Sequence, residues 1–379
     1  MASNQTDVIV IGGGTMGTAA GWALARQGRR VTVLEQHQHI HTLGSHSGHT
    51  RIFRHAYAEG PRYVPWTVEA DGAWAALQER TSLHLMKRTG CLDLAAPGFG
   101  HARAARASAE AYDIAHETLT GAEVVARYPA WNLPADWEAC LDPTAGFLIV
   151  EPAMRALATE LRAHGGEIRE HEHVLSWNAT ADGVNVATET GTYEAEQLIV
   201  TAGAWAGKLL SDLSLPLEVR RKPVFWFDVE RREPFLPERF PVFIAENAQG
   251  EFYGLPIHGE DSIKIGVHSG GEAVDPDTMD RAVSDADLLP ELMAFIAECL
   301  PGVRPRLTAS SVCMYTMTPD EDFLIDRHPE HERVVFAAGF SGHGFKFAPV
   351  VGEYLAALAT DAAAPVRPEF ALARFAGVR

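Results

Sequence analysis

A glycine-rich turn near the N-terminus is the first feature of this sequence with a chemical use. Gly12, Gly14 and Gly17 follow a short apolar run and open a run with helical spacing. Glycines at this spacing allow a tight turn and let backbone N–H groups approach a pyrophosphate, which a helix N-terminus also attracts. Glu35 ends the next apolar run, where an acidic side chain accepts hydrogen bonds from ribose hydroxyls. We predict a dinucleotide site with a free 2′-hydroxyl, and the motif by itself does not distinguish FAD from NAD.

Histidines are concentrated directly after this unit. They are His37, His39, His41, His46, His49 and His55. The first three alternate, so in a strand their rings would share one face and could bind zinc or copper. No carboxylate or cysteine is interleaved with them, and a surface loop is expected at this point of the chain. We therefore expect solvated loop histidines without a metal ion, and a metal site is the alternative.

The chain is acidic, which makes its clustered cations informative. The 379 residues include 32 Lys+Arg and 50 Asp+Glu, a formal net charge of −18. Nucleic acids and anionic membranes require excess Lys and Arg, so neither is expected as a partner. Arg51 and Arg54 follow the nucleotide motif, and guanidinium groups bind carboxylates through paired hydrogen bonds. The pair is a candidate site for an anionic ligand, and the alternative is two surface arginines in salt bridges.

The cysteines indicate a reducing compartment. Cys91, Cys140, Cys299 and Cys313 form no CxxC pair, so no disulfide framework is expected. The N-terminus lacks the basic and apolar regions of a signal peptide, and no apolar run approaches the roughly 18 to 20 residues of a membrane helix. We expect a soluble, cytoplasmic protein.

The glycine turn requires a strand before it and a helix after it. Apolar runs predict strands over 7–11 and 30–34, with a helix over 16–27 between them. Further strands are predicted over 197–201 and 334–338, each followed by a glycine-containing loop. The sequence therefore predicts a mixed α/β fold with a Rossmann-like domain.

The middle of the chain has a different character. Stretches 168–186 and 225–267 consist of short alternating runs typical of strands, and helices are predicted over 152–164, 288–300 and 350–358. This order favours a β-rich substrate domain interleaved with the dinucleotide domain. The predicted bounds are 1–84, 145–215 and 320–379 for the dinucleotide domain, and 85–144 and 216–319 for the substrate domain.

Several sequence blocks, taken in order, resemble one enzyme family. They are GSHSGHTRIFRHAYAEGPRYVP (44–65), AGAW (202–205), YGLP (253–256), IKIGVH (263–268), VCMYTMTPDEDFLID (312–326) and FSGHGFKF (340–347). Over essentially the whole chain they resemble the monomeric sarcosine oxidase and N-methyltryptophan oxidase family. Residues 312–316, 328–331 and 337–347 are most similar to the sarcosine oxidase branch, whereas PDEDF at 319–323 is more similar to the other branch.

The resemblance implies a flavoenzyme that oxidises the C–N bond of a secondary amino acid with molecular oxygen. Cys313 matches the cysteine that joins the 8α carbon of FAD, a role that suits a nucleophilic thiolate. Lys264 matches a lysine that accelerates the reaction with oxygen. Without the resemblance, the alternation of Ser262–Gly266 places Lys264 on the solvent face of a strand, and Cys313 is an ordinary buried thiol.

The resemblance also implies the remaining site residues. The catalytic set is Lys264, Arg51, His268 and Tyr253, and the substrate-binding set is Arg54, Lys346, Tyr315 and Ile244. Arg54 and Lys346 match the pair that binds the substrate carboxylate. The cofactor-binding set is Gly12, Gly14, Thr15, Met16, Gly17, Glu35, Ser45, Thr50, Arg51, Cys313, Gly342, Gly344 and Lys346.

Three positions depart from the family pattern. Where the family has SHHGDTR, Ser47 replaces a histidine and His49 replaces an aspartate beside Thr50 and Arg51. Ile244 stands where the sarcosine branch has a methionine. We expect these changes to affect the orientation of Arg51 and the choice of substrate more than the class of reaction.

The expected function is the demethylation of a small N-methyl amino acid such as sarcosine by a monomeric FAD enzyme. Its products would be glycine, formaldehyde and hydrogen peroxide. The nearest alternative is the same chemistry on N-methyltryptophan or a cyclic imino acid such as proline or pipecolate. An FAD or NAD dehydrogenase with another acceptor is the alternative from a different class.

Overall fold

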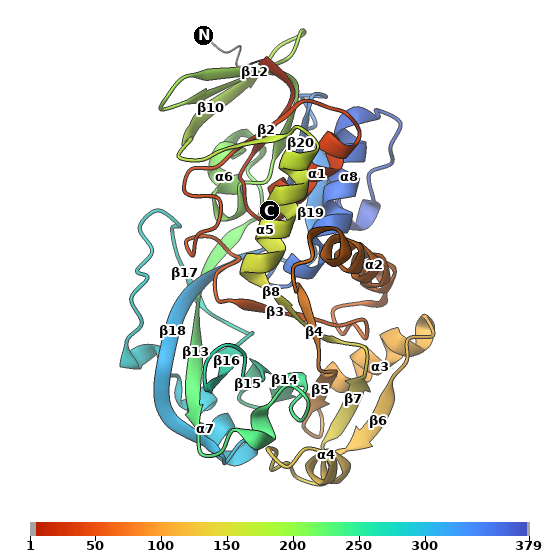
Figure 1. Cartoon of the computed structure of the whole chain (residues 1–379), viewed down its shortest axis with the longest axis vertical. Helices are drawn as coiled ribbons and strands as arrows, with labels where there is room; N and C mark the ends of the chain where they lie inside the picture. Colours follow the sequence, from red (N-terminus) through yellow and green to blue (C-terminus); the bar gives the residue numbers. More distant parts are fainter. Residues whose placement is uncertain (1–4, 377–379) are drawn as a thin grey trace.

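A mixed sheet made from distant parts of the chain forms the upper half of the molecule (Figure 1). The computed structural model describes residues 5–376. β1 (Gln5–Ile11) is parallel to β2 (Val31–Leu34) and to β12 (Thr192–Val200), whose end is parallel to β20 (Val334–Ala338). These strands confirm the ones predicted from the sequence. The other members are β9 (Glu167–Arg169), β10 (Val174–Ala179), β11 (Val184–Thr188) and β19 (Leu324–Arg327).

Helices pack beside this sheet. α1 (Thr15–Arg26) contacts α5 (Val150–Ala163) and α8 (Ala348–Thr360), and α2 (Val64–Thr81) contacts the same two helices. The apolar faces of these helices and of the sheet form one buried core, which accounts for the helical periodicity of the sequence. The helices predicted over 16–27, 152–164 and 350–358 are confirmed. Within residues 5–376, none of the helices has the length and apolar character needed to cross a bilayer.

The loops that follow the parallel strands meet at one edge of the sheet. The glycine turn follows β1, Glu35 follows β2, and the segment 202–205 follows β12. Gly12 has φ of +97°, and a Cβ there would lie 2.5 Å from the carbonyl oxygen of Thr201, so only glycine fits. In open α/β sheets, ligands bind at the carboxyl ends of parallel strands. The fold therefore places the predicted nucleotide motif where a nucleotide binds.

A second, largely antiparallel sheet forms the lower half (Figure 1). β13 (Glu218–Val229) and β18 (Val303–Met317) form its longest pair, and β18 curves up towards the first sheet, carrying Cys313 and Tyr315 with it (Figure 1). The expected α/β class and the β-rich middle of the chain are confirmed. The other strands are β5 (Cys91–Ala95), β6 (Glu117–Thr120), β7 (Glu138–Asp142), β14 (Val242–Asn247), β15 (Gly250–Leu255), β16 (Ser262–Val267) and β17 (Glu272–Ala273). The helices here are α3 (His101–Ala111), α4 (Gly121–Arg127) and α7 (Pro290–Cys299), the last confirming the helix predicted over 288–300.

A small sheet lies between the two large ones (Figure 1). It pairs β3 (Thr50–Phe53) with β8 (Gly146–Ile149), and β8 with β4 (Met86–Arg88). β3 carries Arg51, and Arg54 follows its last residue. The arginine pair singled out in the sequence is thus held at the junction of the two halves.

Candidate active site

A cavity of about 480 Å³ lies at the carboxyl edge of the first sheet. Most of the predicted cofactor-binding residues line it: Gly12, Gly14, Thr15, Met16, Glu35, Ser45, Arg51, Gly342 and Gly344. Gly17 does not line it, because it packs against the carbonyl of Gly12 within the turn. Thr50, Cys313 and Lys346 line a neighbouring, smaller cavity instead.

Glu35 is held in the ionised form at the wall of the large cavity. Its carboxylate accepts hydrogen bonds from the backbone N–H groups of Gly13 (2.9 Å) and His37 (2.9 Å), and His41 lies 3.5 Å away. Burial acts to raise the pKa of Glu35, but the contacts with His41 and these N–H groups outweigh it and lower the pKa. A charged acceptor is therefore fixed where a ribose would lie.

Two polar atoms in the wall of this cavity support the binding of a polar ligand. Among the described residues, neither Nε2 of His46 nor Oγ1 of Thr316 has a hydrogen-bond partner, and both atoms are buried. Burial lowers the pKa of His46 to about 3, so its ring is neutral. An unpaired buried polar group costs about 1–3 kcal/mol, which a ligand with polar atoms can recover. Together with the glycine turn and Glu35, these atoms fit FAD.

The histidine segment is more buried than the sequence predicted. His39 is buried beneath α1, where its Nε2 bonds to the hydroxyl of Thr18 at 2.9 Å. His46 and His55 are buried as well. The expectation of solvated loop histidines is therefore wrong for these three residues: His39 packs against α1, His46 lines the large cavity, and His55 lies beside Asp71 and Asp142. The alternating histidines are not in a strand: the ring centroids of His37 and His41 lie 5.0 Å apart, whereas His39 bonds to Thr18.

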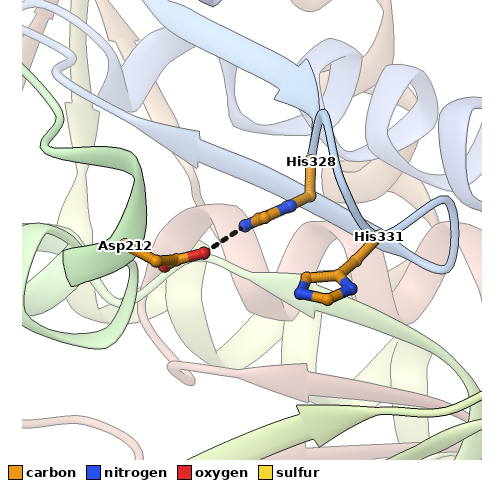
Figure 2. A group of neighbouring side chains, drawn as sticks. All are labelled: Asp212, His328 and His331. Atoms are coloured by element: carbon orange, nitrogen blue, oxygen red, sulfur yellow. Dashed lines mark hydrogen bonds and ion pairs between the residues drawn. The ribbon is translucent and has the colours of Figure 1, made fainter.

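Another pair of histidines lies near a carboxylate, directly after β19. Potential ligand atoms of Asp212, His328 and His331 lie within 4.8 Å of one another (Figure 2). Nδ1 of His328 accepts the backbone N–H of Glu330 at 3.2 Å, so Nε2 carries the proton and donates it to Asp212 at 2.8 Å. Both ring nitrogens are occupied by hydrogen bonds. The group ties the turn after β19 to residue 212, and we assign it no metal.

The smaller cavity, of about 80 Å³, brings together every residue of the predicted catalytic and substrate-binding sets. Arg51, Tyr315, Gly342 and Phe345 line both cavities, so the two adjoin. A Cβ on Gly342, whose φ is +83°, would lie 2.4 Å from the Tyr315 ring, so glycine is needed for the ring to occupy this position. The lining residues are Lys264, Arg51, His268, Tyr253, Arg54, Lys346, Tyr315 and Ile244, together with Ser47, Thr50, Ile52, Glu59, Val224, Leu255, Cys313, Gly342, His343 and Phe345.

Lys264 is buried, so the alternative in which its side chain faces water does not hold. It is 4% exposed because both faces of β16 are covered. Its ammonium donates to the carbonyls of Gly48 (2.7 Å) and Thr50 (3.0 Å) and lies 5.6 Å from the Trp226 ring centroid. Burial, followed by the charge of Arg51, lowers its pKa well below the usual value. In its protonated form, a lysine held by dipoles in a site shielded from water can stabilise a developing negative charge.

Arg51 bridges the two cavities next to Cys313. Its guanidinium donates to the carbonyls of Ser45, Ser47 and Thr50 and lies 3.7 Å from the sulfur of Cys313. The Cys313 thiol donates to the carbonyl of Ser45 at 3.2 Å. Backbone carbonyls therefore orient Arg51, with no carboxylate needed at position 49.

Of the departures from the family pattern, Ser47 and Ile244 line the small cavity and His49 does not. His49 is exposed, with φ of +63°, and its ring meets the edge of Trp226 at 5.4 Å between centroids. Ser47 is buried, and its hydroxyl is 3.4 Å from the carbonyl of Val312. Neither side chain replaces the contacts that orient Arg51.

Arg54 is paired with two carboxylates that sequence reasoning missed, Asp93 and Glu59. It is 1% exposed and donates to Asp93 at 2.7 Å and to both oxygens of Glu59 at 2.7 and 2.8 Å. Burial acts to lower its pKa, but Asp93 and Glu59 outweigh burial and raise it, so Arg54 stays charged. Glu59 lies within the 44–65 block, five residues after Arg54, and that spacing was the available signal. Asp93 lies on β5, and only the fold brings it to the site.

Lys346 is the second cation of the predicted carboxylate site. Its ammonium donates to the hydroxyl of Tyr57 (3.0 Å) and to the carbonyl of His343 (2.9 Å). An ammonium has three donors, which leaves one for a ligand in the cavity. Burial lowers the pKa of Lys346 to about 7, although Glu59 opposes the shift. Tyr57 in turn bonds to Nδ1 of His343 at 2.8 Å, which fixes the position of the lysine.

His268 and two tyrosines line the same small cavity. The hydroxyl of Tyr315 lies 3.5 Å from Nδ1 of His268, and Tyr253 also lines the cavity. Burial raises the pKa of Tyr253 to about 12 and that of Tyr315 well above its usual value, so both remain neutral. The lining of the cavity thus combines Arg54, Lys346 and the Glu59 carboxylate with largely aromatic side chains.

Comparisons with known proteins agree with this architecture. The sequence profile of the family described as "FAD dependent oxidoreductase" matches residues 7–358. The chain is 39% identical over 366 residues to a monomeric sarcosine oxidase of Bacillus sp. (strain NS-129), which covers 94% of each chain. It is 36% identical over 372 residues to an N-methyl-L-tryptophan oxidase of Yersinia pestis (strain Pestoides F), covering 97% of this chain and 99% of the other. Among solved structures, a Tyr258Phe mutant of NikD, an amino acid oxidase, superposes with a TM-score of 0.86 at 25% identity and 97% coverage of both chains.

Proposed function

Because the chain belongs to the FAD-dependent amine oxidoreductases, in the family of monomeric sarcosine oxidases and N-methyltryptophan oxidases, we propose that it demethylates a small N-methyl amino acid such as sarcosine with molecular oxygen. The family predicted from the sequence is thereby confirmed. The observation that carries the proposal is the small cavity, which adjoins the large one and has Arg54 and Lys346 on its wall. Its size also favours a small substrate, since a cavity that accommodates benzene measures about 150 Å³.

We assign different roles to the residues of the small cavity. Lys346 and Arg54 bind the substrate carboxylate, while Tyr253, His268, Tyr315 and Ile244 enclose the N-methyl group. The nearby cations disfavour a second positive charge, so the amine binds with its lone pair free. Bound FAD supplies the electron acceptor for the C–H bond that breaks. Water then hydrolyses the imine to glycine and formaldehyde, and Lys264 stabilises the charge that develops as oxygen becomes hydrogen peroxide.

Domain organisation and cellular context follow the same proposal. We assign 1–84, 145–215 and 320–379 to the FAD domain and 85–144 and 216–319 to the substrate domain; of these, 1–4 and 377–379 lie outside the described residues. We further propose that the enzyme is a cytoplasmic monomer. Its expected ligands are one secondary amino acid and oxygen, with no nucleic acid or membrane partner.

We propose that Cys313 joins FAD covalently. All four cysteines are free and buried, and Cys313 is the one that lines a described cavity, beside the Arg51 guanidinium. Acid-precipitated wild-type protein should keep its yellow colour in the pellet, whereas C313S should release it to the supernatant. The C299S variant, which removes a buried thiol at the end of α7, is the control and should retain the colour. Release of all colour from the wild type would contradict the assignment.

The experiment that tests the proposed function is an assay of oxygen uptake with sarcosine as the donor. We expect hydrogen peroxide in proportion to the oxygen consumed. Reduction of an artificial dye without oxygen uptake would show that the enzyme is a dehydrogenase.

A further inference from the structure

Lys222 is a buried lysine outside both cavities. It lies on β13, is 5% exposed, and donates to the carbonyl oxygens of His268 (2.9 Å), Ser269 (2.9 Å) and Gly270 (3.2 Å). An ammonium has three donors and no acceptor, so a single turn uses its whole hydrogen-bonding capacity. Lys222 is therefore placed to hold this turn.

The 268–270 turn depends on contacts with other residues to keep its conformation. It connects the end of β16 to β17, and Gly270 and Gly271 both have positive φ, at 64° and 108°. Because glycine can adopt many backbone conformations, this turn has many alternative conformations when no contact holds it. The backbone N–H of His268 bonds to Glu251 at 2.7 Å, and beyond that residue the Lys222 ammonium gathers three successive carbonyls.

The same ammonium also contacts the other member of the cavity wall. Its Nζ lies 5.1 Å from the ring centroid of Tyr315, a cation–π distance. The hydroxyl of Tyr315 lies 3.5 Å from Nδ1 of His268. One buried cation thus contacts both the backbone carbonyl of His268 and the ring of Tyr315.

We propose that Lys222 is a positioning residue for substrate binding: by holding the 268–270 turn and the Tyr315 ring, it fixes the wall formed by His268 and Tyr315. The inference rests on the proposed function, because it takes the small cavity to be the substrate site. Lys222 does not line that cavity and takes no part in the chemistry. Its loss should therefore weaken substrate binding and leave the chemical steps nearly unchanged.

The contact between Lys222 and the 268–270 turn should depend on pH. Burial, followed by Arg220, lowers the pKa of Lys222 to about 8, and Cys313 and Glu251 oppose the shift. Besides these groups, Tyr315 and His268 face the ammonium. A neutral amine has only two N–H donors, so one carbonyl loses its partner as pH rises through about 8. In the wild type, the affinity for a carboxylate ligand should therefore include a contribution from Lys222 that is present below pH 8 and lost above it. K222M should lack this contribution.

The test compares the wild-type holoenzyme with K222M, K222R and, as a control, K87M, which removes an exposed lysine paired with Glu238. Amide hydrogen exchange over 268–272 is followed by mass spectrometry, and KM and kcat are measured with sarcosine. We expect K222M to exchange faster there and to raise KM roughly tenfold, about 1.4 kcal/mol, with kcat changed less than about twofold. K222R should restore part of the loss, and K87M should behave as the wild type.

Each outcome decides the proposal. Unchanged exchange in K222M would show that Lys222 does not hold the turn, and faster exchange with unchanged KM would show that the turn does not shape the substrate site. Equal losses in kcat and kcat/KM would indicate a chemical role instead. If the wild type oxidises no amine, the proposed function fails, and the exchange measurement still decides whether Lys222 clamps the turn.

Discussion

Replacing Lys264 with methionine should slow the reaction with oxygen by about 10²- to 10³-fold, the range seen when a preorganised electrostatic donor is removed from an active site. The ammonium is buried, fixed by the carbonyls of Gly48 and Thr50, and needs no reorganisation as charge develops on oxygen. Anaerobic reduction by substrate does not develop that charge and should change by less than about tenfold. Stopped-flow absorbance of the flavin measures the two half-reactions separately.

A second variant distinguishes the loss of the Lys264 charge from a general loss of structure. K264Q keeps a donor for the two carbonyls but removes the charge, so it should also slow reoxidation while retaining flavin content. K87M at the surface should leave both half-reactions unchanged. Equal slowing of reduction and reoxidation in K264M and K264Q would contradict the assigned role of Lys264.

Replacing Lys346 with methionine should raise KM for sarcosine by about 10- to 100-fold, because a hydrogen bond to a charged group contributes about 1.5–3 kcal/mol. Lys346 lines the small cavity and has one donor to spare, whereas Arg54 already donates to the carboxylates of Asp93 and Glu59 and to the carbonyl of Ala56. Steady-state kinetics across a sarcosine series measure the effect. K346R, which keeps the charge, should recover part of the affinity, and an unchanged KM in K346M would contradict the role.

The proposed role of Lys346 also predicts the direction in which carboxylate binding changes with pH. Burial lowers the pKa of Lys346 to about 7, so its ammonium predominates below pH 7 and is lost above it. The affinity for acetate, a carboxylate that has no amine to titrate, should therefore fall as pH rises through 7. In K346M this component of the pH profile should vanish, and a profile that stays the same would assign the titration to another group.

The sequence was sufficient for those parts of the site that depend on local chain geometry. The strands beside the glycine turn, the turn itself and Glu35 follow from short-range spacing, because each lies next to its partner element in the chain. The residues of the small cavity were found only through motif blocks that resemble a known family. The spacing of residues could not predict that β3, β16, β18 and the 340–347 loop line one cavity, because these segments are far apart in the sequence.

The errors have a common physical cause. Lys264 and His39 are polar residues that local patterns place in water, yet both are buried because distant segments cover them. Asp93 escaped notice for the same reason: it reaches Arg54 only through the pairing of β5 with β14 and β7. Burial and long-range partners depend on tertiary packing, and a single sequence carries no direct signal for them.

The most direct test of the central claim is peroxide release from a panel of sarcosine, N-methyltryptophan, proline and pipecolate at equal concentrations. A cavity of about 80 Å³ bounded by Ile244, Tyr253 and Tyr315 predicts that kcat/KM is highest for sarcosine and lowest for N-methyltryptophan. Higher kcat/KM for N-methyltryptophan than for sarcosine, or no peroxide from any of the four, would contradict the account.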